Sequence, residues 1–200
     1  MRRGSMKFWP LASALATGLV LAVQPLALPV QSPEAPKRLN ETMLAGLRPG
    51  KDTLAEAEKR FGSKLRIKTV DRDTSAEWLD ECWGHKVHLE FDEKRMIRSV
   101  TVSLLGVQSG DCRDARHVGP LVIEKLKTGR GLALKEAKDR VIGLYGEPNS
   151  SGPSTQAGRE LESLFYAFDW AGSDVPQAME VCCDRSTGRA VEIKLALTSL

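Results

Sequence analysis

The chain has 200 residues, 42% of them hydrophobic and 28% charged, an ordinary globular composition for one large or two small domains. Its formal charge of +3 comes from Arg2, Arg3 and Lys7, because the first 22 residues hold these three basic residues and no acidic one. The remainder is formally neutral and lacks the basic surface that phosphate binding requires, so we exclude nucleic acid as a partner.

The N-terminus has the pattern of an export signal. A basic stretch, residues 1–7, precedes the apolar run Phe8 to Val23, and Ala22 offers a small residue before a cut. A membrane span needs about 20 apolar residues, and prolines flank this shorter run. We therefore predict a signal peptide over 1–22, an exported chain that is periplasmic or secreted, and no integral membrane span after cleavage. Residues 23–38 hold four prolines and predict an extended tether.

Two amphipathic helices are expected, each preceded by a shorter one. Thr53 and Glu56 form a capping box, and the helix they begin has one apolar face and ends at Gly62. A similar face recurs eighty residues later, in a helix about one turn longer that stops at Gly146 to Pro148. The faces comprise Leu54, Ala57 and Phe61, then Leu134, Ala137 and Val141, and the short helices are expected over Leu39 to Leu47 and Leu121 to Lys127.

Period-two alternation predicts strands after each helix. Trp78 and Trp170 are each followed fourteen residues later by an aspartate, Asp92 and Asp184, and then by an alternating strand. The segments concerned are Lys64 to Val70, Ala76 to Leu79, Val87 to Phe91, Arg98 to Leu104, Leu164 to Trp170 and Arg189 to Leu195. We predict an α+β fold of two tandem repeats, each a helix packed on one face of its own antiparallel sheet. The boundaries are 39–105 for repeat 1, 106–120 for a linker and 121–200 for repeat 2.

The pattern as a whole resembles the β-lactamase-inhibitor-protein fold, which the small outer-membrane lipoproteins of the barrel-assembly machinery share. The resemblance covers roughly Leu39 to Leu197. It rests on Pro49-Gly50, Thr53 to Gly62, Trp78, Asp92, Gly129, Leu134 to Pro148, Trp170 and Asp184. It implies a non-enzymatic, extracytoplasmic protein-binding module that often uses the open face of its sheet. The first forty residues contain no cysteine, so the lipid anchor of those lipoproteins has no attachment site here.

Four cysteines lie in the expected mature chain, and an even count in an exported protein indicates disulfides. Aligning the two hairpins places Cys183 at the position of Phe91, facing the core, and Cys182 at the position of Glu90, facing the open side. Neighbours on opposite faces of a strand are poorly placed to bond each other. We favour a pairing of Cys82 with Cys112, and the alternative pairs Cys182 with one of them.

The residues that could contact a partner are the ones that differ between the repeats or face the open side of the sheet. We select Trp83, Phe165, His88, Glu90, Glu180 and Cys182. Cys82, His85 and His88 are spaced by three, but an odd spacing on a strand sends the two histidines to opposite faces, and we expect surface histidines rather than a zinc site. We identify no catalytic residues, no metal site and no cofactor.

We therefore predict a non-enzymatic secreted or periplasmic module that binds another envelope or extracellular protein through the open sheet face or a groove between the repeats. Two alternatives stay open at this point. One is a structural cell-envelope protein held by an uncleaved leader, and the other is a small thiol-redox protein that uses Cys182.

Overall fold

The structure is a computed structural model that describes residues 40–70, 73–105, 125–168 and 175–197. All of them belong to one compact unit, Lys37–Leu200. The predicted signal peptide, the tether, the linker at 106–120, Cys112 and Trp170 lie outside the described residues. The elements are α1 Leu54–Phe61, a 3-10 turn Gly62–Lys64, β1 Arg66–Val70, β2 Asp73–Asp80, β3 His85–Phe91, β4 Ile97–Leu104, α3 Lys138–Tyr145, β5 Ser150–Gln156, β6 Arg159–Ala167, β7 Ala178–Asp184 and β8 Ala190–Ala196.

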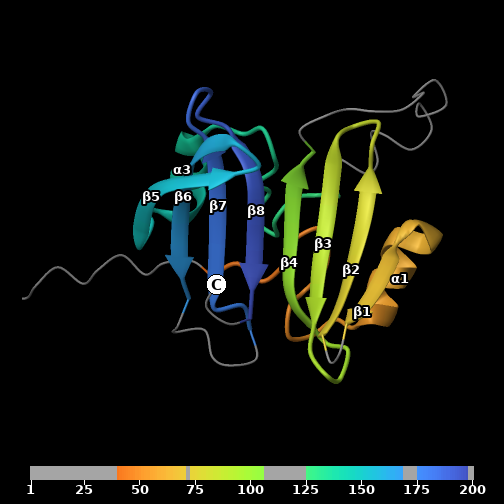
Figure 1. Ribbon diagram of the computed structural model, residues 1–200. Helices are drawn as coiled ribbons and strands as arrows, with labels where there is room; N and C mark the ends of the chain where they lie inside the picture. The colour runs from red at the N-terminus through yellow and green to blue at the C-terminus, as the bar shows by residue number, and fades with distance from the viewer. Residues whose placement is uncertain (1–39, 71–72, 106–124, 169–174, 198–200) are drawn as a thin grey trace, which may run out of the picture. The chain divides into compact units, whose positions relative to one another are not determined.

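The eight strands form one antiparallel sheet in the order β1-β2-β3-β4-β8-β7-β6-β5 (Figure 1). The prediction of two repeats, each with its own sheet, is therefore wrong. The joint is the ladder between β4 and β8, which runs from Ser99 opposite Ala196 to Ser103 opposite Glu192. Two four-stranded sheets would each leave an edge of unpaired backbone groups here, and the ladder satisfies both edges at once. The fold is also richer in strand than expected, with two α-helices in the described part of the chain.

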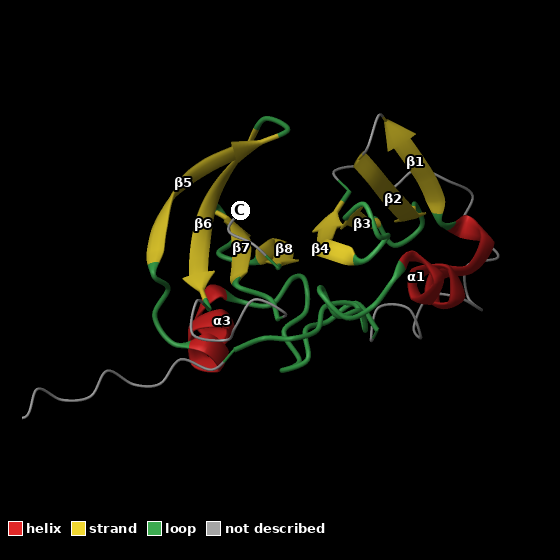
Figure 2. Ribbon diagram, turned by 90° about the horizontal axis from the view of Figure 1, so that it is seen from below, coloured by secondary structure: helices red, strands yellow, loops and turns green. Residues whose placement is uncertain are grey.

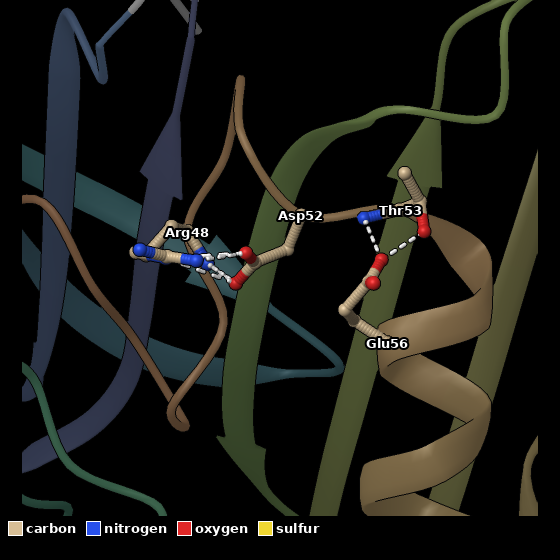
Figure 3. Close-up of polar contacts among 4 residues, drawn as sticks. All are labelled: Arg48, Asp52, Thr53 and Glu56. Atoms are coloured by element: carbon tan, nitrogen blue, oxygen red, sulfur yellow. Dashed lines mark hydrogen bonds and ion pairs between the residues drawn. The ribbon is translucent and has the colours of Figure 1, made fainter.

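The first capped helix is confirmed. The Glu56 carboxylate accepts hydrogen bonds from the Thr53 backbone N–H, at 2.9 Å, and from the Thr53 hydroxyl (Figure 3). Leu54 and Ala57 are buried on the inner face of α1, and Gly62 ends the helix with a φ of 64°. Local capping and one apolar stripe thus fix this element as the sequence indicates.

The second helix begins four residues later than expected. α3 starts at Lys138, and Leu134 lies in the turn before it. The reason is tertiary: the Lys135 N–H donates to the Ala190 carbonyl at 2.7 Å, and the Ala190 N–H donates to the Glu136 carbonyl at 2.9 Å. These bonds hold residues 135–136 against the start of β8 and prevent them from joining the helix.

Neither predicted short helix is present over the residues that the structure describes. Ala45 and Gly46 have positive φ angles of 52° and 73°, which turn the chain so that Leu44 forms bridges with Leu47 and Thr128. The turn after Leu47 is held by Asp52, whose carboxylate accepts the Arg48 backbone N–H at 2.8 Å and the guanidinium at 2.6 Å (Figure 3). Two backbone segments far apart in sequence therefore meet here by tight turns instead of helices.

Strand β5 was not predicted. It contains Gly152 and Pro153 and shows no apolar alternation, and its residues are exposed or half-buried. It pairs only with β6, at the edge of the sheet, where a proline without an N–H can be accommodated. In the neighbouring strand β6 the predicted burial of Leu164 and Tyr166 is confirmed, but the strand begins at Arg159, five residues before the predicted start.

The main core lies on one face of the sheet. Figure 2 shows both helices on that same side, and buried residues of α1, α3 and the strands form one cluster there. Val87, Leu89 and Trp78 are in this cluster, as the alternation predicts, and so is Cys183. A second, smaller cluster of Leu161, Cys182 and Val191 has Leu104 packed against it. Within the described residues, no helix is long and apolar enough to cross a membrane.

Candidate functional site

The face of the sheet opposite the helices, called the open face below, carries a continuous row of cross-strand neighbours. Strand register places His88 opposite Glu77 and Thr101, and Glu180 opposite Lys194 and Phe165. The part of the row that runs from β2 to β5, called the central row, is Glu77, His88, Thr101, Lys194, Glu180, Phe165 and Ser150. Because directly opposed residues project to the same side of a sheet, all seven side chains belong to the open face.

The fold brings five of the six predicted contact residues onto this face. His88, Glu180 and Phe165 lie in the central row. Glu90 lies in the row on one side, opposite Ser99, and Cys182 lies in the row on the other side, opposite Ser163. The union of β4 and β8 is what joins the residues from the two halves of the chain into one surface.

Charged side chains pair at the β2–β3 side of the open face. Glu77 Oε1 lies 2.6 Å from Lys86 Nζ and 3.4 Å from His88 Nδ1, the second without hydrogen-bond geometry. The hydrogen bond from Lys86 holds the pKa of Glu77 below its ordinary value, against a smaller opposing effect of burial. The Glu77 side chain is 41% exposed, so the pair contributes little to stability and keeps this region polar and hydrated.

Glu90 has its own set of partners beside this pair. Its carboxylate accepts a hydrogen bond from the Ser99 hydroxyl at 2.5 Å, lies 3.9 Å from His88 Nε2 and lies 4.0 Å from Lys194 Nζ. Sequence reasoning did not select Lys86, Ser99 or Lys194. Alternation of side chains along each strand could have identified them, because it places all three on the open face once the β4–β8 register joins the two halves of the sheet.

On the β7–β8 side of the open face, the carboxylates of Glu180 and Glu192 form hydrogen bonds only with neutral groups of the described residues. Glu180 accepts a hydrogen bond from the Ser163 hydroxyl, and Glu192 accepts one from the Gln156 side-chain amide at 2.9 Å. Neither carboxylate forms an ion pair with another described residue. Both carboxylates are half-buried, and Lys194, which is directly opposite Glu180, has its ammonium group 4.0 Å from Glu90.

Cys182 faces the predicted side but is not accessible. It is 6% exposed and packs with Leu161 and Val191. Figures 1 and 2 show that β5 crosses over β6 and β7 on the side away from the helices. Burial, with smaller effects from Glu180 and Glu192, raises the pKa of the Cys182 thiol to about 12. Because Cys182 is buried, its predicted role as a contact residue has no support from the structure.

The two free thiols, Cys182 and Cys183, also bear on the disulfide prediction. A pairing of Cys182 with Cys82 or Cys112 is not formed, which leaves the favoured pairing of Cys82 with Cys112. Cys82 lies in the turn between β2 and β3, where its N–H donates to Asp80 Oδ1 at 3.2 Å. Cys112 lies outside the described residues, so the favoured pairing stays a prediction.

Trp83 lies away from the central row. It follows Cys82 in the same turn, is 38% exposed, and lines a cavity of 210 Å³ together with His85, Leu126, Ala133, Leu134 and Lys135. His85 is only 4% exposed, so the expectation of a surface histidine is wrong at this position. His85 is the first residue of β3 and lies two positions before Val87, so its side chain is on the same, core-facing side of the strand.

The described residues do not assemble a recognisable catalytic or metal-binding set. Within the ranges that the structure describes, no group of three or more histidine, cysteine, aspartate or glutamate residues is arranged to hold a metal ion. Glu77 and Asp80 lie in β2, and Glu81 lies in the turn that follows it.

Comparison with protein-family models gives no match, and comparison with curated proteins gives none either. Among solved structures, a cysteine-rich secretory protein from Staphylococcus aureus aligns with 80% of this chain at 13% identity, with a TM-score of 0.45 over 48% of its own length. An extracellular protein containing an SCP domain from Bacillus anthracis aligns with 82% of this chain at 11% identity, with a TM-score of 0.45 over 49% of its length. The aligned region spans about half the length of these two proteins.

A candidate β-lactamase inhibitor protein from Streptococcus mutans aligns with 80% of this chain and 92% of its own, at 13% identity and a TM-score of 0.26. An inhibitor protein of the kind that the sequence resembles is thus among the similar structures. The tandem repeat and the link to the assembly lipoproteins have no such support. With TM-scores of 0.45 and below, none of these similarities carries an argument about function.

Proposed function

We propose that this chain is a non-enzymatic, exported protein-binding module whose partner docks on the open face of the sheet. The observation that carries the proposal is the central row, a continuous line of polar and half-exposed side chains on a face that neither described helix covers. Antiparallel sheets commonly pack one face on the core and leave the other to solvent, which makes that face available to a partner.

The charge pattern of the open face indicates the chemistry of the partner. Glu77 and Glu90 each have a lysine within 4.0 Å, whereas Glu180 and Glu192 have only neutral hydrogen-bond partners among the described residues. Two lysine or arginine side chains of the partner, placed over Glu180 and Glu192, would neutralise the two charges. Phe165, which is directly opposite Glu180, supplies an apolar contact next to them. Complementary charge of this kind sets specificity and association rate more than affinity.

A capture experiment with charge-reversed variants tests this proposal. Purified mature chain carrying Glu180→Arg is compared with wild type and with Glu93→Arg, an equal charge change at an exposed residue of the β3–β4 turn. Proteins cross-linked from an envelope extract are identified by mass spectrometry. We expect at least about a tenfold loss of the captured partner for Glu180→Arg and no loss for Glu93→Arg. Equal capture by both variants, or turnover of a substrate by the wild type, contradicts the proposal.

Export is a separate part of the proposal and rests on the N-terminal sequence. Mass spectrometry of the native chain decides between a cleaved signal peptide and a retained leader. We expect a mature N-terminus at or near Val23. An intact N-terminus favours the alternative of a structural envelope protein held by its leader.

A further inference from the structure

The cavity beside Trp83, called the Trp83 pocket below, combines an apolar lining with one buried polar group. Leu126 and Leu134 are almost fully buried at its wall, and Trp83 is 38% exposed at its rim. His85, which is 4% exposed, lines the same cavity from the first position of β3. Among the described residues of the lining, Lys135 is the only one with a side chain charged at neutral pH, and it is exposed.

The imidazole of His85 lacks the partners that a buried polar group normally has. Its Nδ1 atom is buried without a hydrogen bond, and neither ring nitrogen bonds to another described residue. Native proteins pair the great majority of buried polar side-chain atoms, so an unpaired one requires an explanation. Burial, and to a smaller degree Lys135, lowers the pKa of His85, while Asp80 opposes this effect. The ring is therefore neutral at neutral pH, with one donor and one acceptor nitrogen.

The size of the cavity limits what can fill it. Its volume of 210 Å³ is below the range of roughly 300–1,000 Å³ that is typical of pockets for drug-sized ligands. It suits one large side chain. An aliphatic or phenylalanine side chain would fill the apolar space but leave the imidazole unpaired, and a carboxylate would lose its hydration against leucine side chains.

We propose that the Trp83 pocket binds a tyrosine side chain of the partner, with its ring against Trp83 and the apolar wall and its hydroxyl hydrogen-bonded to the His85 imidazole. Tyrosine has an apolar ring with one polar end, which matches a pocket that has an apolar wall and one unpaired polar group. Buried aromatic side chains in pockets of this kind are frequent anchors of protein interfaces. The proposal rests on the proposed function for the existence of a protein partner, but the pocket can be tested without that partner.

The probes are p-cresol, which is the tyrosine side chain alone, toluene, which lacks the hydroxyl, and 3-methylindole, the tryptophan side chain. Each is titrated at millimolar concentration into the mature chain while NMR follows the Trp83 indole N–H and the His85 ring nitrogens. We expect p-cresol to shift both signals and to bind about fivefold more tightly than toluene, the effect of one hydrogen bond. The Trp83 signal is assigned with Trp83→Phe.

Two variants identify the contacts. His85→Phe removes the hydrogen-bonding group while keeping an aromatic ring, and we expect it to make p-cresol and toluene bind equally. Trp83→Ala should weaken all three probes. The proposal is wrong if p-cresol leaves both signals of the wild-type chain unchanged, if toluene binds as tightly as p-cresol, or if 3-methylindole binds more tightly than p-cresol. The wild-type comparison decides the matter even if a variant fails to fold.

The result of the p-cresol titration does not depend on whether the open face binds a partner. Binding of p-cresol with the expected preference supports the pocket even when Glu180→Arg leaves partner capture unchanged, an outcome that overturns the open-face proposal alone. Absence of p-cresol binding overturns the pocket even when Glu180→Arg abolishes capture.

Discussion

Replacement of Tyr145 by phenylalanine should destabilise the fold far more than loss of one hydroxyl usually does. The Tyr145 side chain is 3% exposed, and its hydroxyl lies 2.7 Å from Glu41 Oε2 and 2.7 Å from Thr128 Oγ1. Glu41 is itself 2% exposed and also accepts the backbone N–H groups of Thr42, Met43 and Arg130. The hydroxyl therefore joins α3 to the turns at residues 41–43 and 128–130.

The magnitude follows from the two bonds that the variant removes. A hydrogen bond to a charged group contributes about 1.5–3 kcal/mol and a neutral one about 1 kcal/mol, so we expect a loss of about 3 kcal/mol in the free energy of unfolding. The ring itself remains, so no cavity is created. Of a total stability of about 5–15 kcal/mol for a typical domain, this loss is large.

Urea unfolding followed by far-ultraviolet circular dichroism measures the loss, provided that the slope m is unchanged. The same substitution in a Glu41→Gln background should cost about 1 kcal/mol less, because the hydroxyl then faces an amide instead of a carboxylate. Glu93→Gln, at an exposed turn position, is the matched control and should change stability by less than about 0.5 kcal/mol. A loss below about 1 kcal/mol for Tyr145→Phe, or equal losses in both backgrounds, refutes the reasoning.

Three further predictions concern single groups. Asp52→Ala should lower the free energy of unfolding in urea by about 3 kcal/mol, because its carboxylate is 7% exposed and accepts a backbone N–H. Arg48→Ala should lower it much less, because the guanidinium is 54% exposed, and equal losses would contradict this. Burial raises the pKa of Cys182 to about 12 and that of Cys183 to about 11. Iodoacetamide at pH 8 should therefore label both thiols at least about 100-fold more slowly in the folded chain than in urea. Fast labelling of Cys182 in the folded chain would support the thiol-redox alternative. The pKa of Glu77 is lowered in the folded chain, chiefly by Lys86, so the ionised carboxylate stabilises the fold above the unfolded-state pKa and this effect is lost as the pH falls through the folded-state pKa. The difference in urea midpoint between wild type and Glu77→Gln should therefore shrink between pH 7 and pH 3. A difference that grows as the pH falls would contradict this reasoning.

Strand faces could be predicted from the sequence because the alternation is strict wherever one side packs on the core. Val87 and Leu89 are fully buried, and Glu90 between Leu89 and Phe91 is exposed. Alignment of the two hairpins also placed Cys183 in the core correctly. The structure adds a reason: both β3 and β7 have a bulge at the same place, between Glu90 and Phe91 and between Cys182 and Cys183.

The union of the two halves into one sheet could not be predicted from side chains. The β4–β8 ladder consists of backbone hydrogen bonds, and Ser99, Thr101 and Lys194 along it would suit an exposed edge equally well. Strand β5 was missed for a related reason, since an edge strand with Gly152 and Pro153 shows no apolar pattern. Burial of Cys182 depends on how β5 crosses over β6 and β7, which period-two alternation does not predict.

Strand β3 connects the two surfaces proposed to bind a partner. His85 and His88 are three positions apart, so the strand directs one to the core side and the other to the open side. On the core side His85 meets apolar walls and stays unpaired, and on the open side His88 lies between Glu77 and Glu90. A shift of one residue in register would exchange the two environments and remove both surfaces at once. Variants that test the open face and the Trp83 pocket separately must therefore change side chains and leave the β3 backbone intact. His85→Phe and Glu180→Arg meet this condition, whereas a proline in β3 would disrupt both surfaces.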